Sequence, residues 1–255
     1  MSLLNAFCCM PNSVRRIFLM SMLCGGLGIL PAEVQGQELP TEGSVEPSES
    51  DEDNPLSGKI IVRVEEEWIV DIANPDPELD IPQIVTVFGP DDPQLGTHGI
   101  FEVNHSTVPD FVDGGMQLQC WFRDSRMGAR RHLNPAELAI GIERIRYTTV
   151  VELKDSKLIL EIKNGDSVTF GKFGGEGQLR LALWTWRHNL NSYNAQNSIT
   201  HSRVSYGANR VNRFLRAGIR YYTSDGEVIV DETDTIIHQV ADANLGPAPV
   251  NAPTE

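Results

Sequence analysis

Apolar residues recur at every second position through most of residues 57–239, and this is the period of a β-strand. Successive side chains of a strand point to opposite faces, so alternation produces one apolar face and one polar face. The clearest apolar positions are Ile60, Val62, Val64, Trp68 and Val70 in one run, Leu158, Leu160 and Ile162 in a second, and Leu179, Leu181 and Leu183 in a third. A chain with this pattern is expected to fold into sheets.

Two dipeptides between alternating runs predict β-hairpins. They are Asn164-Gly165 and Asp225-Gly226. Asn-Gly and Asp-Gly tolerate the positive φ angles of the two-residue turns that match the twist of paired strands. We therefore expect antiparallel strands on both sides of each dipeptide.

One short helix is predicted, over residues 134–140. Asn134 suits the N-cap, Pro135 the first helical position and Glu137 the third, and Gly141 would end the helix. About ten strands with one short helix predict an all-β fold, an antiparallel β-sandwich of jelly-roll or related topology. A closed barrel is the alternative.

The first 36 residues have the three parts of a secretory signal peptide. Arg15 and Arg16 precede an apolar run over residues 17–30, which is short for a membrane-spanning helix, and Val34 and Gly36 stand at the expected cleavage site. An uncleaved anchor or a buried core helix is the alternative. Cleavage after Gly36 predicts an exported protein of the periplasm, the cell surface or the extracellular space.

Two segments that flank the expected domain are predicted to be disordered. Residues 37–56 hold seven acidic residues and no basic one, and residues 240–255 are rich in Ala, Pro and Asn. Such segments bury too little apolar surface to offset the entropy lost on folding. Residues 57–239 are therefore expected to form one domain.

Charge and cysteine content exclude several classes of protein. The formal net charge of −14 disfavours nucleic acid and anionic membrane surfaces as partners, and no stable membrane insertion is expected after signal cleavage. Three of the four cysteines lie in residues 1–36, so the cleaved chain keeps only Cys120 and forms no internal disulfide. Cys120 lies in an alternating run and is expected as a buried, inert thiol.

No motif in the sequence identifies a reaction. A hydrolase elbow, a phosphate-binding glycine loop, a paired-cysteine metal motif and a His-Glu-x-x-His zinc motif are all missing. The six histidines are scattered, without a metal-ligand spacing. Acidic pairs such as Asp110 with Asp113 would act as a glycosidase pair only at the right separation in the fold. We therefore assign no catalytic residue and no required cofactor.

A candidate calcium site consists of four oxygen-bearing side chains that alternate in a short segment, Asn74, Asp76, Glu78 and Asp80. Calcium takes several oxygen ligands, and alternation can bring them to one side of a loop. Two prolines stiffen the segment, and the EF-hand pattern is missing. A solvated polar loop without metal is the alternative.

A second candidate site, for a carbohydrate ligand, follows the third alternating run. Its residues are Trp184, Trp186, His188, Asn189, Asn191 and Tyr193. Indole faces stack on sugar rings, and amide side chains hydrogen-bond to hydroxyl groups. The alternative, which the sequence favours, is that both tryptophans pack in a second apolar layer while the asparagines shape turns.

Several short motifs stand in a particular order between residues 65 and 238. They are Glu65-Glu66-Glu67-Trp68, Pro75-Asp76, Pro82-Gln83, Phe101-Glu102-Val103-Asn104-His105, Gly114-Gly115-Met116-Gln117-Leu118-Gln119, Asn164-Gly165, Phe173-Gly174-Gly175, Asn189-Leu190-Asn191-Ser192-Tyr193 and Tyr206-Gly207-Ala208-Asn209-Arg210-Val211. In this order the motifs resemble a group of exported, uncharacterised proteins of planctomycete-type bacteria. The resemblance implies export without an assigned activity, and it transfers no catalytic or binding residue.

The sequence therefore predicts an exported, non-catalytic β-sandwich with a structural, adhesive or ligand-binding role. A glycan or a protein of the cell envelope is the expected partner. The alternative is a carbohydrate-binding module, with or without calcium, or a carbohydrate-active enzyme that uses residues 184–194.

Overall fold

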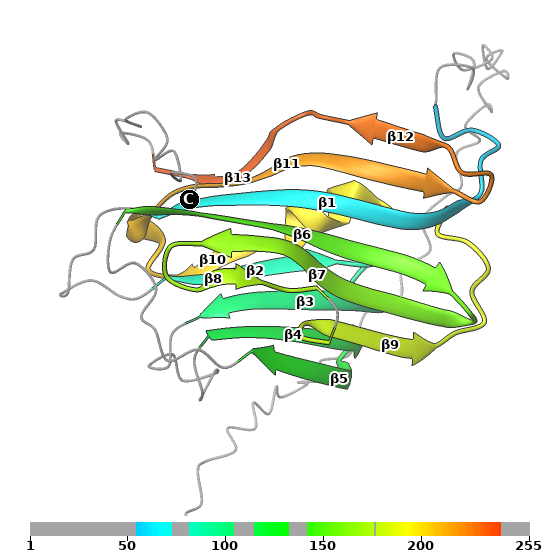
Figure 1. The fold of residues 1–255 in the computed structure, drawn as a ribbon, viewed down its shortest axis with the longest axis horizontal. Coiled ribbons are helices and arrows are strands. Elements are labelled where there is room, and N and C mark those ends of the chain that lie inside the picture. The colour runs from blue at the N-terminus through cyan, green and yellow to red at the C-terminus, as the bar shows by residue number, and fades with distance from the viewer. Residues whose placement is uncertain (1–54, 73–81, 105–114, 133–141, 176, 241–255) are drawn as a thin grey trace, which may run out of the picture. The chain divides into compact units, whose positions relative to one another are not determined.

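The computed structural model describes residues 55–72, 82–104, 115–132, 142–175 and 177–240. These residues form two antiparallel sheets with a hydrophobic core between them (Figure 1). Within the described residues neither sheet closes on itself. The all-β sandwich predicted from the alternation is confirmed, and the barrel alternative is not.

The larger sheet, sheet A, has the strand order β12-β11-β1-β6-β7-β8, with β13 also beside β11 and β9 also beside β7. Its strands are β1 (Ile61–Ile72), β6 (Glu143–Lys154), β7 (Lys157–Ser167), β8 (Gly171–Phe173), β9 (Arg180–Trp184), β11 (Val211–Thr223), β12 (Val228–Asp231) and β13 (Thr235–Gln239). The smaller sheet, sheet B, has the order β10-β2-β3-β4-β5. Its strands are β2 (Gln83–Phe88), β3 (Thr97–Asn104), β4 (Gly115–Phe122), β5 (Ser125–His132) and β10 (Arg203–Tyr206).

A short helix, α1 (Ala195–His201), packs against β2, and a 3-10 turn, η2 (Ala208–Arg210), leads into β11. Asn194 caps α1, because its side-chain oxygen accepts a hydrogen bond from Gln196 N at 2.9 Å. The helix expected over residues 134–140 lies outside the described residues. Within the part of the chain that the structure describes, no helix has both the length and the apolar character to cross a membrane.

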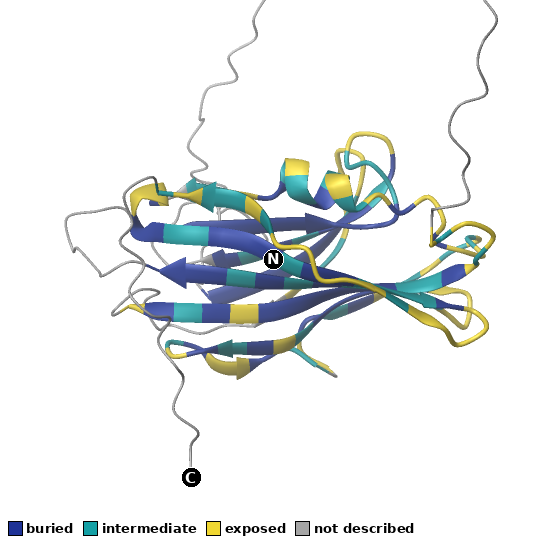
Figure 2. Cartoon of the chain, turned by 90° about the horizontal axis from the view of Figure 1, so that it is seen from above, coloured by how far each residue is buried: buried dark blue, intermediate teal, exposed yellow. Residues whose placement is uncertain are grey.

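The inward faces of the two sheets meet around a cluster of aromatic side chains. The Phe101 ring of β3 packs edge-on against the Tyr147 ring of β6, with centroids 5.0 Å apart. The Tyr147 hydroxyl also lies 2.5 Å from Thr86 Oγ1 of β2, which satisfies a polar group inside the core. Figure 2 shows buried and partly exposed residues alternating along the long strands, as a sandwich requires.

The predicted phase of the first strand is correct in its middle and wrong at its start. Val64, Trp68 and Val70 are buried as expected, whereas Ile60 is 51% exposed and Ile61 is 3% exposed. An irregularity in the pairing of β1 with β11 lies between Ile61 and Arg63. Such an irregularity changes the face to which the residues before it point.

The two predicted hairpins have different outcomes. Asp225-Gly226 does connect β11 to β12, but Gly226 alone has a positive φ, of 90°, and its N–H donates to Thr223 O at 3.1 Å. The connection is therefore a turn ending in a left-handed glycine, not the expected turn with two positive φ angles.

Asn164-Gly165 is not a hairpin turn, and that prediction is wrong. The dipeptide lies inside β7, where two residues of β7 face Tyr147 alone on β6, and Asn164 has a φ of 54°. It is a β-bulge, which accepts the same positive φ as a turn. The turn between β6 and β7 is Asp155-Ser156, with φ angles of 51° and 58°.

The predicted signal peptide, residues 1–36, lies outside the described residues. So do all but two residues of the acidic spacer and all but one residue of the C-terminal tail. Leu56, assigned to the spacer, packs against the core.

Candidate functional site

The register of β9 on β7 places a tryptophan on the outer surface of sheet A. Trp184 pairs with Lys157, and Leu183 pairs with Leu158. Leu181 is buried in the core, whereas Trp184, on the other face of the strand, is 59% exposed. The alternation predicted for this run is therefore confirmed.

Trp186 lies just beyond the end of β9, and it is 78% exposed. Its ring meets the ring of Trp184 edge to face, with centroids 3.9 Å apart and planes at 82°. The favoured interpretation from sequence, that both tryptophans pack in a second apolar layer, is wrong. Alternation shows that two residues share a face, but it does not show whether another layer covers that face.

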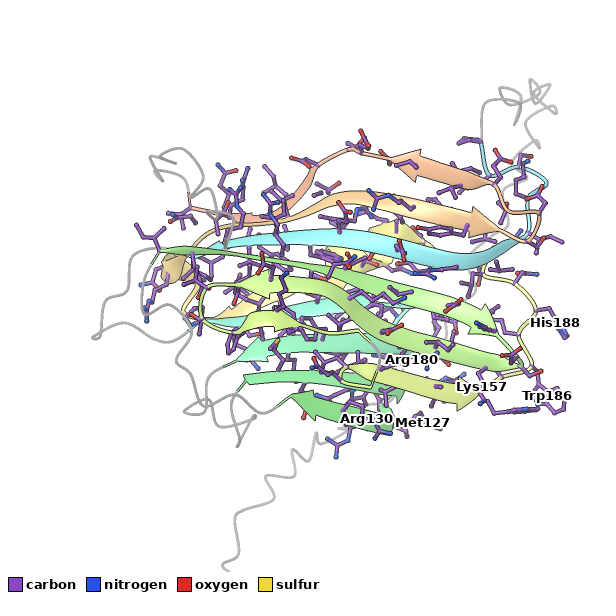
Figure 3. All side chains as sticks on the ribbon, in the orientation of Figure 1. Met127, Arg130, Lys157, Arg180, Trp186 and His188 are labelled. Carbon is purple, nitrogen blue, oxygen red and sulfur yellow. The ribbon has the colours of Figure 1, made fainter. Side chains whose placement is uncertain are left out.

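The tryptophan pair lines a surface pocket of about 330 Å³. The rest of the lining comes from the β6–β7 turn and from the segment after Trp184, and it includes Lys154, Asp155, Lys157 and His188. Figure 3 shows Lys157, Trp186 and His188 close together at one end of the molecule. The pocket therefore combines indole surface with hydrogen-bond donors.

The charged groups of this pocket are mostly basic. Lys154 and Lys157 are exposed, and among the described residues neither forms an ion pair. Asp155 is the one carboxylate in the lining. Both lysines are therefore available to an anionic group of a ligand.

Arg187 ties the segment that carries the tryptophans to the β2–β3 loop. Its Nη2 lies 2.5 Å from Asp91 Oδ1, and its Nη1 donates to Ser192 Oγ at 3.0 Å. On the other side, Thr185 N donates to Ser156 O at 3.0 Å. The segment is thus held from two directions. Sequence reasoning missed this contact, because Arg187 and Asp91 are far apart in the chain and form no motif.

Asn191 and Asn189, which the sequence assigned to the ligand site, shape the loop. Asn191 Oδ1 accepts a hydrogen bond from Ile61 N at 3.0 Å, and Asn191 Nδ2 donates to Lys59 O at 2.6 Å. Asn189 Oδ1 accepts from Asn191 N at 3.2 Å. Neither asparagine lines the tryptophan pocket. The Asn191 amide therefore fixes the loop to the start of β1, and the Asn189 amide braces the loop itself.

Tyr193, the last predicted residue, is buried beside α1. Its hydroxyl lies 3.3 Å from Ser198 Oγ, and its ring packs edge-on against Tyr221, with centroids 6.4 Å apart. Burial raises the pKa of Tyr193 above its ordinary value. The six predicted residues therefore divide into two groups: Trp184, Trp186 and His188 line the pocket, and Asn189, Asn191 and Tyr193 support the loop.

A second surface pocket, of about 510 Å³, lies on the Asp91 side of Arg187. Phe122 and Leu95 are its exposed apolar residues, and its polar lining is Asp91, Asp92, Ser192, Asn194 and Asn197. No pattern in the sequence indicated this pocket, because its residues come from three separate segments. It is the competing location for a ligand.

The predicted calcium ligands Asn74, Asp76, Glu78 and Asp80 lie outside the described residues. Among the residues that are described, no group of three or more His, Cys, Asp or Glu side chains is placed to hold a metal ion. The calcium site stays a prediction.

No protein-family model, curated protein or solved structure matches this chain. The resemblance to exported proteins of planctomycete-type bacteria likewise stays a prediction. Function is therefore inferred from the site.

Proposed function

We propose that this protein is an exported β-sandwich that binds a glycan at the pocket of Trp184 and Trp186. The exposure of the two indole rings, 59% and 78%, is the observation that carries the proposal. Exposed apolar surface of this kind is stabilised when a ligand removes it from water. A sugar ring offers a flat apolar face for that purpose, with hydroxyl groups around its edge.

The polar lining of the pocket supports the same ligand class. Lys154, Lys157 and His188 stand around the indole rings, and Ser156 lies in the adjoining turn. These groups can hydrogen-bond to hydroxyl or carboxylate oxygens of a sugar whose face rests on a tryptophan. An apolar platform with a polar edge is therefore suited to a carbohydrate.

We propose that the pocket binds a glycan and does not hydrolyse it. Glycoside hydrolysis by the common mechanism uses two carboxyl groups at a defined separation. Within the described residues, the pocket presents one carboxylate, that of Asp155. The pocket is thus suited to holding a glycan without cleaving it.

Export is part of the proposal and is supported by the sequence pattern of residues 1–36. Mass spectrometry of the protein, expressed in a Gram-negative host and recovered outside the cytoplasm, is expected to give a first residue at or near Gln37. A cytoplasmic protein that keeps Met1 would contradict export and leave the glycan proposal to be judged separately.

A glycan array with the wild-type protein and two single variants tests the binding site. We expect Trp184→Ala and Trp186→Ala each to weaken binding about tenfold, which corresponds to about 1.4 kcal/mol of lost contact. Melting temperatures are expected to change little, because both rings are exposed. Running the array with calcium and with a chelator also tests the predicted calcium dependence.

Phe122→Ala is the matched control, because Phe122 is 45% exposed and lines the second pocket. It is expected to bind as the wild type does. A loss with Phe122→Ala but not with the tryptophan variants would place the ligand in the second pocket. That result, or an array without any bound glycan in either condition, would overturn the proposal.

A further inference from the structure

A row of basic side chains continues from the tryptophan pocket across β9 onto β5. This basic strip consists of Lys154, Lys157, Arg180 and Arg130. Figure 3 shows Arg180, Arg130 and Met127 together on the side of the molecule that also carries Lys157 and Trp186. This clustering of basic side chains is informative because the whole chain has 35 acidic and only 21 basic residues.

The two strands that carry the strip are neighbours in space. β9 contacts both β4 and β5, and a methyl group at Gly128 of β5 would lie 3.5 Å from Leu181 Cδ2 of β9. Arg180 and Trp184 share the outer face of β9, four residues apart. At about 3.3 Å per residue, this spacing separates them by about 13 Å, so a ligand that reaches both is longer than one sugar.

The acid paired with Arg180 is placed so that the guanidinium remains accessible. Arg180 Nε lies 3.7 Å from Glu161 Oε2, but only 3% of the Glu161 side chain is exposed, against 39% for Arg180. A ligand on this surface therefore meets the guanidinium first. Arg130 is exposed on β5, and among the described residues it forms no ion pair.

The net negative charge of the protein does not prevent an anion from binding here. At physiological ionic strength, charges separated by more than about 8 Å are largely screened from each other. The strip then acts through its own charges, and acids on other faces contribute little. A ligand with widely spaced charges suits this arrangement, because its charges can lie on the basic strip without approaching the acidic residues on other faces of the protein.

We infer that the ligand is an acidic polysaccharide whose carboxylate or sulfate groups lie along the basic strip while one or more sugar rings stack on Trp184 and Trp186. The inference rests on the proposed function and specifies its ligand class. The sugar rings supply contact with the indoles, and the acidic substituents supply contact with Lys157, Arg180 and Arg130. A neutral glycan would gain the contact with the indoles but not the contact with the basic strip.

Single-stranded nucleic acid also combines flat rings with negative charge, but the observations favour the polysaccharide. Nucleic acid carries a phosphate at every residue, and its affinity comes mainly from neutralising many of them. Four basic residues on a protein with a net charge of −14 are few for that purpose. An oligonucleotide therefore belongs in the test as a competitor.

Two matched pairs of polymers test the inference by isothermal titration calorimetry. Polygalacturonate is compared with its methyl ester, and dextran sulfate with dextran, so that each pair differs only in charge. We expect the protein to bind at least one charged polymer about tenfold more tightly than its neutral partner. That preference is expected to shrink as sodium chloride rises from about 0.05 M to about 0.5 M.

Variants locate the charge preference on the strip. Arg130→Ala and Lys157→Ala are each expected to weaken binding of the charged polymer about two- to fivefold. Arg130→Ala is expected to leave the neutral polymer unchanged, because Arg130 does not line the tryptophan pocket. Arg203→Ala is the matched control, because Arg203 is an exposed arginine on β10, at the opposite edge of sheet B from β5. It is expected to have no effect.

The outcomes separate this inference from the proposed function. If charged and neutral polymers bind equally and Trp186→Ala weakens both, glycan binding stands and the acidic ligand class is overturned. If no glycan binds at all, both fail. Tighter binding of a single-stranded oligonucleotide than of either charged polymer, or an equal effect of Arg203→Ala and Arg130→Ala, would also overturn the inference.

Discussion

Glu66 on β1 and Arg216 on β11 form an ion pair inside the sandwich, with Arg216 Nη1 3.3 Å from Glu66 Oε1 and only 1% of the Glu66 side chain exposed. Burial raises the pKa of Glu66 to about 7, although the Arg216 charge opposes this change. A carboxyl whose pKa is higher in the folded state binds more protons there than in the unfolded chain. Its contribution to stability is therefore complete below about pH 4.5 and is lost as the pH rises through about 7.

This relationship predicts the pH dependence of Glu66→Gln, which keeps the shape of the protonated acid. The variant and the wild type are expected to have equal free energies of unfolding below about pH 4.5. Above about pH 8, the variant is expected to be more stable by about 3 kcal/mol, because it never places a negative charge in the core. Urea unfolding of both proteins across this range measures the difference, in which the other titrating groups cancel. A variant less stable than the wild type at the alkaline end would show that the ion pair outweighs the cost of burial.

A second prediction concerns Asp71, which joins three strands of sheet A. Asp71 Oδ1 accepts from Arg144 Nε of β6 at 2.6 Å, and Asp71 Oδ2 accepts from Arg213 Nε of β11 at 3.0 Å. Asp71→Ala leaves two half-buried guanidinium groups without their carboxylate, so we expect a loss of about 2–3 kcal/mol in the free energy of unfolding.

The control for Asp71 is Glu67→Ala, because Glu67 forms a more exposed ion pair with Arg220, at 2.6 Å. Exposed pairs contribute little, so this variant is expected to lose less than about 1 kcal/mol. Denaturant unfolding at one pH compares the two. If both variants lost the same free energy of unfolding, the Asp71 contacts across three strands would stabilise the protein no more than an ordinary surface ion pair does.

The fold was predictable from sequence because alternation is a local property. It identifies strands even where the exact register or turn is predicted wrongly. Val64, Val70 and Leu181 are buried, and each lies where the register is regular. The errors lie where the register changes: the irregularity after Ile61 reverses the face of Ile60, and the bulge at Asn164-Gly165 uses the positive φ that was assigned to a turn. A positive φ is a property of the backbone position and does not by itself choose between a bulge and a turn.

The candidate site was predictable only in part, because its residues were identified but their environment was not. The sequence singled out Trp184, Trp186 and His188 for their chemistry. It could not show that these residues are uncovered in the described structure, since their exposure depends on which strands lie beside β9. It also missed Lys157 and Arg130, whose relevance depends on contacts between elements far apart in the chain.

Asn191 gives a third prediction, which separates support of the loop from contact with a ligand. Its amide bonds to backbone atoms of Ile61 and Lys59 at 3.0 Å and 2.6 Å, so Asn191→Ala leaves two backbone groups without those partners. We expect it to lower the free energy of unfolding by about 1–3 kcal/mol. Trp186→Ala is expected to leave stability nearly unchanged, since its ring is 78% exposed. Thermal unfolding of both variants makes the comparison, and a neutral Asn191→Ala would return Asn191 to the list of ligand contacts.

The bulge in β7 leads to a fourth prediction. A methyl group at Gly165 would lie 2.2 Å from Phe173 Cδ2, a ring that is buried in the core. Gly165→Ala must displace that ring, and we expect it to cost about 1–3 kcal/mol. Gly128→Ala is the control, because its nearest neighbour would be Leu181 Cδ2 at an ordinary 3.5 Å. Denaturant unfolding measures both variants. A tolerated Gly165→Ala would show that β8 can move away from β7 at little cost.

The last prediction concerns Cys120, which is fully buried on β4 and whose pKa burial raises to about 11. The thiol is protonated at neutral pH and shielded from reagents, so we expect no reaction of the native exported protein with a thiol-specific chromophore. In urea, the same protein is expected to release one equivalent of chromophore, because the predicted cleavage after Gly36 would remove the other three cysteines. The count in urea therefore checks the signal peptide, and the difference between the two counts checks the burial. Rapid labelling of the native protein that Cys120→Ser abolishes would show that β4 opens to solvent.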